Sequence, residues 1–177
     1  MMPSVASLNA CDIVSQPGSV NRSSAPQGST GPTPTLPDRA SPHLSFAELA
    51  CKDGTPYPAE WFDRAAILAG VFEQIRAACG DKPITIGSAY RTPEHNARVG
   101  GSKRSQHCEG RALDLYPPAG MSPLEFYKRV RRIVLAKGCP VHGLGRYPRF
   151  VHIDIRERAD GRVTVWSGTR AWAEMQG

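Results

Sequence analysis

The segment 105–114 carries two groups that bind metals and activate water. A turn of small residues separates His107 from Asp114, which stands near the end of a short apolar run. A second histidine, His152, lies in the alternating segment 150–156. Two imidazoles and one carboxylate from separate segments make a ligand set for a catalytic zinc ion, whose fourth position stays open for water. These residue types therefore indicate a hydrolytic metal centre.

Arg91 stands at a junction between two predicted elements. The β-branched segment 82–88 predicts a strand, and Thr92 followed by Pro93 is typical of the cap and first residue of a helix. An arginine at such a junction either binds a carboxylate in bidentate fashion or fixes the turn. Both interpretations of Arg91 stay open at this point.

The two segments that carry the acidic and second histidine ligands are predicted to be strands. In segment 111–116 the Asp114 carboxylate is flanked by leucines, and burying that charge is costly unless a cation satisfies it. Segment 150–156 alternates between polar and apolar residues, so His152 and Asp154 share one polar face. That face suits the wall of an active site.

Three helices and a last hairpin are expected around these strands. Periodicity and capping signals predict helices over 45–50, 58–79 and 122–137. The Asp160–Gly161 pair predicts a tight turn between segment 150–156 and a last strand over 163–166.

Composition separates the chain into two parts. Residues 1–42 are rich in proline and serine and contain no aromatic residue, so we expect a disordered leader followed by one folded domain over 43–177. No stretch has the length of a membrane span. The N-terminus has neither the basic nor the apolar region of a signal peptide, so we expect synthesis in the cytoplasm.

The charge and the cysteines narrow the class of partner. Lys and Arg exceed Asp and Glu by 22 − 16 = 6, which favours an anionic partner such as a cell wall. No nucleic-acid-binding motif accompanies this charge, so nucleic acid is not the expected partner. The five cysteines form no disulfide framework and no metal-binding pair, and Cys108, beside His107, is interpreted as a bystander.

The motifs together resemble a known family. Ser105, His107, Gly110, Ala112 and Asp114 form an S-x-H-x-x-G-x-A-x-D pattern. With the later histidine in an H-x-D strand, this pattern resembles the zinc D-Ala-D-Ala metallopeptidase family, in particular its small single-domain bacterial and phage members. Segments 88–92 and 143–154 are also similar to that family, and the resemblance covers about residues 44–170.

The resemblance implies a fold, a site and an activity. The fold would be α+β of the hedgehog/DD-peptidase type, with a small antiparallel sheet flanked by helices. Zn²⁺ would be held by His107, Asp114 and His152, and Arg91 and Ser105 would contact the substrate. The implied substrate is a stem or cross-bridge peptide of peptidoglycan, cut by a carboxypeptidase or endopeptidase.

The sequence departs from the family at the general base. Better-known relatives carry Glu or Asp shortly before the last histidine, whereas segment 146–151 contains no acid. Asp154 is the nearest replacement, and it is either the base or a partner that orients a ligand histidine. Glu109 is a weaker candidate because it lies in a turn, and His142 and His95 receive no firm role.

Two functions remain in view. The first is a monomeric zinc metallopeptidase that acts on the cell wall, in wall remodelling or as an endolysin in phage lysis, reaching its substrate by phage-type release or delivery in a virion. The second is a catalytically inactive, zinc-stabilised module that binds the cell wall. The missing upstream acid motivates the second.

Overall fold

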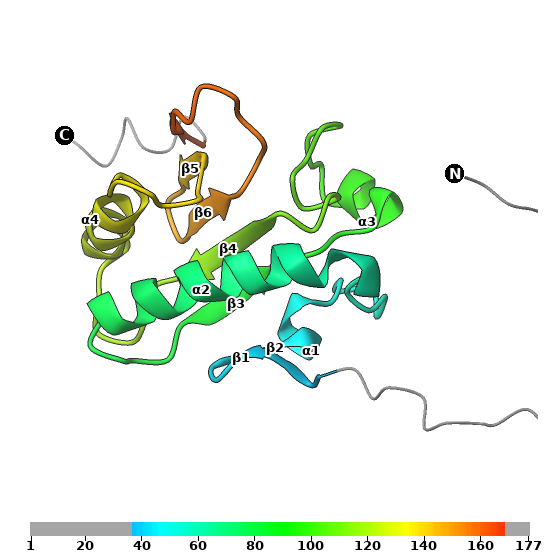
Figure 1. The fold of residues 1–177 in the computed structure, drawn as a ribbon, viewed down its shortest axis with the longest axis horizontal. Helices are drawn as coiled ribbons and strands as arrows, with labels where there is room; N and C mark the ends of the chain where they lie inside the picture. The colour runs from blue at the N-terminus through cyan, green and yellow to red at the C-terminus, as the bar shows by residue number, and fades with distance from the viewer. Residues whose placement is uncertain (1–36, 169–177) are drawn as a thin grey trace, which may run out of the picture. The chain divides into compact units, whose positions relative to one another are not determined.

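The computed structural model describes residues 37–168. Its centre is a five-stranded sheet, most of which can be followed in Figure 1. The strand order is β3-β4-β6-β5-β7. The strands are β3 (Thr85–Ser88), β4 (Ala112–Tyr116), β5 (Gly143–Arg146), β6 (Val151–Asp154) and β7 (Thr164–Ser167). Neighbours are antiparallel except for β5 and β7, which are parallel. With the helices below, the α+β class expected from the resemblance is confirmed.

The expected hairpin around Asp160–Gly161 is wrong. The turn forms, with Gly161 at a positive φ of 60°, but β7 pairs with β5 and not with β6. The reason is that β6 lies between β4 and β5, so neither of its edges is free. The chain after β6 must therefore cross to the open edge of β5, where it enters parallel.

A short hairpin precedes the sheet. Its strands are β1 (Arg39–Ser41) and β2 (Leu44–Ser45), which pair antiparallel. Strand β1 begins before residue 43, the start of the folded domain expected from composition. Its position is held by a hydrogen bond of 2.6 Å from the Ser41 hydroxyl to the Glu73 carboxylate on a helix. Most of the expected leader, residues 1–36, lies outside the described residues.

Three of the helices begin where the sequence places their caps, whereas the helix expected over 58–79 begins as a 3₁₀ turn. The helices are α1 (Phe46–Leu49), the 3₁₀ turn η1 (Ala59–Trp61), α2 (Phe62–Ala78), α3 (Pro93–Arg98) and α4 (Pro123–Val134). Ser45 and Glu48 form the expected capping box, while Thr92 and Ser122 cap α3 and α4. None of these helices has the length and apolar character needed to cross a bilayer.

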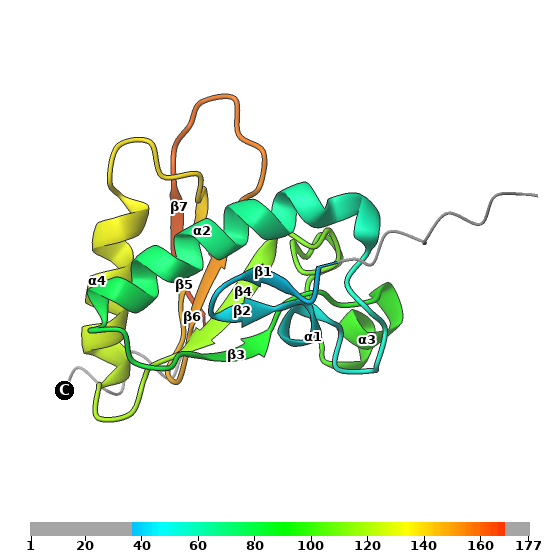
Figure 2. The same ribbon diagram turned by 60° about the horizontal axis from the view of Figure 1, so that its bottom comes forward.

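The sheet presents one apolar face and one polar face. Apolar side chains from β4 and β6, among them Leu113 and Ile153, are fully buried with residues of α2 and α4, such as Phe72 and Phe126. Both long helices lie on this side of the sheet (Figure 2). Because side chains alternate along a strand, the polar residues of β4 and β6 point to the opposite face.

Candidate metal centre

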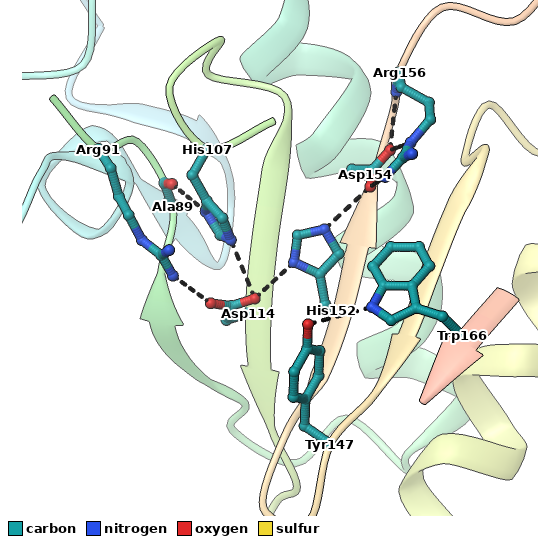
Figure 3. Close-up of polar contacts among 9 residues, drawn as sticks. All are labelled: Ala89, Arg91, His107, Asp114, Tyr147, His152, Asp154, Arg156 and Trp166. Carbon is teal, nitrogen blue, oxygen red and sulfur yellow. Dashed lines mark hydrogen bonds and ion pairs between the residues drawn. The ribbon is translucent and has the colours of Figure 1, made fainter. Parts of the chain in front are cut away.

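The register of the sheet brings the predicted ligands together. Asp114 on β4 lies opposite His152 on β6, and His152 lies opposite Gly145 on β5. Gly145 in turn lies opposite Trp166 on β7. His107 reaches the same place from the loop that precedes β4 (Figure 3).

The three predicted ligands converge on one point. His107, Asp114 and His152 are all buried, and one ligand atom from each lies within 4.8 Å of the others. The Oδ1 atom of Asp114 is 3.2 Å from Nε2 of His107 and 2.8 Å from Nδ1 of His152. The spacing is that of donors arranged around a single ion.

The remaining ring nitrogens are tied to oxygen atoms on the far side of each imidazole. Nδ1 of His107 lies 2.5 Å from the carbonyl oxygen of Ala89, which can only accept, so Nδ1 carries the hydrogen. Nε2 of His152 lies 3.1 Å from Oδ2 of Asp154. This arrangement fixes the ring orientations and aims the other nitrogens at Asp114, as in metal sites whose ligands are oriented by outer partners.

The donor set fits a metal ion. Burial lowers the pKa of His107 and favours its neutral form, so Nε2 presents a lone pair to the carboxylate of Asp114. Two acceptors this close repel each other unless a cation lies between them. Two imidazoles and one carboxylate are the ligand types of a three-residue catalytic zinc site. Their role as ligands remains a prediction.

Arg91 fixes the other oxygen of Asp114. Its Nη2 donates to Oδ2 of Asp114 at 2.7 Å, and its Nε donates to Ser88 Oγ at 2.7 Å. Burial opposes ionisation of Asp114, but its close contacts with the imidazoles of His107 and His152 hold the pKa of that carboxyl well below its usual range. Arg91 thus orients the carboxylate while still lining the cleft.

Asp154 is enclosed. It is 0% exposed, and Arg156 donates from Nε to Oδ1 at 2.7 Å and from Nη2 to Oδ2 at 2.6 Å. Burial opposes ionisation, but these bonds and the one from His152 hold the pKa of Asp154 well below its usual range. With both oxygens occupied, the geometry favours the alternative in which Asp154 orients His152.

Gly143 makes room for this carboxylate. Gly143 on β5 lies opposite Asp154 on β6, and a Cβ added at Gly143 would overlap the Asp154 carboxylate. We expect Gly143→Ala to lower the free energy of unfolding by about 1–3 kcal/mol through overpacking, and to weaken metal binding. Urea denaturation and metal titration measure both. The control is Gly70→Ala on α2, where nothing lies within 4 Å of an added Cβ. It should leave metal binding unchanged and leave stability unchanged or raised. Equal losses of stability and metal binding in the two variants would contradict the account.

Sequence reasoning missed two aromatic residues of the site. Trp166 donates from Nε1 to the Tyr147 hydroxyl at 3.2 Å, and its ring centroid lies 5.4 Å from that of His152. Tyr147 stacks on Phe150 at 4.4 Å. A signal was present at Gly145, because a glycine opposite a ligand histidine leaves space for a large neighbouring side chain, and a Cβ there would meet the Trp166 ring.

The centre lies in a cleft of about 1110 Å³. Ser105 and Glu109 line this cleft, as the sequence-based roles require. His142 and His95 are not among its lining residues. Nδ1 of His142 lies 2.8 Å from the carbonyl oxygen of Arg156. Cys108 is also outside the lining, and burial raises the pKa of its thiol.

An α+β fold with a buried His-Asp-His donor set in a polar cleft is typical of metal-dependent hydrolases. The family model for Peptidase M15 matches residues 42–154. The chain therefore belongs to the peptidase M15 family.

A curated relative is similar over a shorter segment. It is the zinc D-Ala-D-Ala carboxypeptidase of Streptomyces albus G, 44% identical over 51 residues. The similar segment covers 29% of this chain and 20% of that relative. The chain thus matches about a fifth of the relative's length.

Proposed function

We propose that the protein is a zinc-dependent metallopeptidase that hydrolyses peptide bonds in the stem or cross-bridge peptides of peptidoglycan. The convergence of His107 Nε2 and His152 Nδ1 on the Asp114 carboxylate carries the proposal. Membership in the peptidase M15 family and the similarity to a zinc D-Ala-D-Ala carboxypeptidase support the metal and the substrate class.

The residues of the chain divide the work. A zinc ion held by His107, Asp114 and His152 would supply a Lewis acid and a water of lowered pKa. Arg91 holds the Asp114 carboxylate in place through its second oxygen. Asp154 orients the His152 ring and is a positioning residue.

The proton of the attacking water needs a carboxylate that faces the cleft. Besides Asp114, the acids that line the cleft in the described part of the chain are Glu109 and Glu157. Glu157 pairs with Arg111 at 2.6 Å, whereas no ion pair within residues 37–168 engages Glu109. Glu109 is therefore the better placed acceptor in this proposal.

The cleft suits an anionic peptide. Its cationic lining residues are Arg91, Lys103, Arg104, Arg111 and Arg156, and they outnumber its acids. Cationic side chains bind carboxylates by charge-assisted hydrogen bonds. Stem peptides with free carboxylates are thus the favoured substrates, and the formal net charge of +6 suits an anionic wall.

Tyr147 is placed to donate a hydrogen bond to the substrate. Its hydroxyl accepts from Trp166 and points toward His152, so its own hydrogen is available to the scissile carbonyl oxygen (Figure 3). We expect Tyr147→Phe to lower kcat about tenfold, the effect of losing about 1.4 kcal/mol of transition-state stabilisation, with metal content unchanged. Tyr116→Phe, outside the cleft lining, is the control. A kcat equal to that of the unaltered protein would contradict the role of Tyr147.

The biological setting is part of the proposal. Wall remodelling and phage lysis both require that the enzyme reach the wall, by release or by delivery in a virion. Lysis of cells that express the protein together with a membrane-permeabilising partner, and its absence for Asp114→Ala, would support the lytic setting. If cells that express either the unaltered protein or Asp114→Ala stay intact, the lytic setting is contradicted. Wall binding without cleavage would instead favour the inactive binding module.

A further inference from the structure

A second group of metal-binding side chains lies outside the cleft. Cys51, Asp53 and His95 offer one thiol, one carboxylate and one imidazole, and one ligand atom from each lies within 4.8 Å of the others. None of the three lines the cleft of the first centre. Cys51 is buried, His95 is half-buried and Asp53 is exposed, so the group opens to solvent on one side.

Local structure brings these residues together. The chain turns tightly after α1, with Cys51 N donating to Thr55 O at 2.9 Å and Gly54 at a φ of 94°. This turn places Cys51 and Asp53 beside the start of α3. Thr92 caps α3 and accepts from the backbone N–H of His95, which fixes His95 in the first turn.

Hydrogen bonds from neighbouring residues hold the acidic and thiol groups in place. Asp53 accepts from Thr55 N at 3.0 Å and from Thr92 Oγ1 at 2.7 Å. The sulfur of Cys51 accepts from the backbone N–H of Thr92 at 3.5 Å.

A cation already approaches the group. Nη2 of Arg98 lies 3.2 Å from Nδ1 of His95 and 3.8 Å from Oδ2 of Asp53. A guanidinium only donates, so Nδ1 of His95 presents its lone pair there. The Arg98 side chain is 61% exposed and can swing into solvent, which would leave its place to a metal ion.

We propose that Cys51, Asp53 and His95 form a second metal site, which binds a divalent ion of the zinc class. Thiolate and imidazole favour borderline or soft ions over Mg²⁺ and Ca²⁺.

The ion would brace the wall of the first centre. Tyr90 N donates to Leu49 O at 3.0 Å, and Arg91 N donates to His107 O at 3.1 Å. The segment between β3 and α3 therefore joins the second site to the residues that orient Asp114 and His107.

Cobalt substitution tests the proposal without measuring activity. The first centre contains no thiolate ligand, so a thiolate-to-cobalt charge-transfer band in the near ultraviolet reports on a cysteine-containing site alone. We expect Co²⁺ titration of the metal-free protein to give this band and a second bound ion per chain. Cys51→Ser should lose the band and that second ion while keeping the first. Cys108→Ser should keep both, which matters because Cys108 adjoins His107.

Two further variants keep the test decisive. Asp114→Ala should lose the first ion and retain the charge-transfer band, whatever the outcome for peptidase activity. Arg98→Ala should raise the affinity for the second ion severalfold, because a competing cation is removed. If Cys51, Asp53 and His95 bind no ion, this variant would show no such gain. Two results would overturn the second site. One is a band that is lost in Cys108→Ser but kept in Cys51→Ser. The other is a single bound ion and no charge-transfer band in the unaltered protein.

Discussion

Replacement of His107 by alanine is expected to abolish metal binding at the first centre and to lower the rate of peptide hydrolysis by at least ~10³-fold, because metal catalysis supplies several kcal/mol. His107 lies between the Ala89 carbonyl and the Asp114 carboxylate, and no other imidazole besides His152 lines the cleft within residues 37–168. Its loss leaves two donors, too few to hold the ion tightly.

The measurements for His107→Ala are metal content after dialysis and kcat/KM on a stem peptide. His43→Ala is the matched control, since His43 lies outside the cleft and contacts Glu73 at 2.9 Å. It should keep both metal and activity. Full activity in metal-depleted His107→Ala would contradict the assignment of this histidine as a ligand.

Replacement of Asp154 by asparagine is expected to weaken metal binding roughly 10- to 100-fold, the effect of losing an outer partner of a ligand. The NH₂ group of asparagine cannot accept a hydrogen bond, whereas both oxygens of the carboxylate accept from His152 or Arg156. The His152 ring therefore loses the contact that orients it. The replacement also removes hydrogen bonds to the half-buried Arg156 charge, which should destabilise the fold by about 1.5–3 kcal/mol. Metal titration and urea denaturation measure the two effects.

Activity at saturating metal separates the two roles considered for Asp154. If Asp154 only positions His152, excess zinc should restore most of the kcat of Asp154→Asn, because the chemical step is intact. If Asp154 is the general base, kcat should fall roughly 10²- to 10⁴-fold, and added zinc should not restore it. Arg156→Lys is the companion variant: it keeps the charge beside Asp154 but gives up the bidentate contact, and should show a smaller loss of metal affinity. Unrestored kcat in Asp154→Asn would return Asp154 to the role of base.

Local signals in the sequence predicted the elements well because they act over a few residues. Ser45 with Glu48 forms a capping box, and the caps at Thr92 and Ser122 start α3 and α4. Alternation placed His152 and Asp154 on one face of β6, and Asp114 lies on the facing strand. Together with the residue types and the family resemblance, these rules predicted that His107, Asp114 and His152 gather at the first centre.

Long-range pairing limited the rest of the prediction. The Asp160–Gly161 turn is visible in the sequence, but the position of β6 between two strands, which sends β7 to β5, is not. The burial of Asp154 also depends on Gly143 across the sheet, a relation that no spacing along the chain reveals. For the same reason Trp166 was not predicted beside His152.

Digestion of purified peptidoglycan by the zinc-loaded protein, with and without a chelator, tests the central claim most directly. Mass spectrometry of the released muropeptides would show which bond is cut. We expect cleavage of peptide bonds that the chelator abolishes and added zinc restores, and none with His107→Ala. The contradicting result is that stem and cross-bridge peptides from several wall types stay intact, although the protein is confirmed to hold zinc at the first centre. That result would contradict the peptidase activity and favour a wall-binding module.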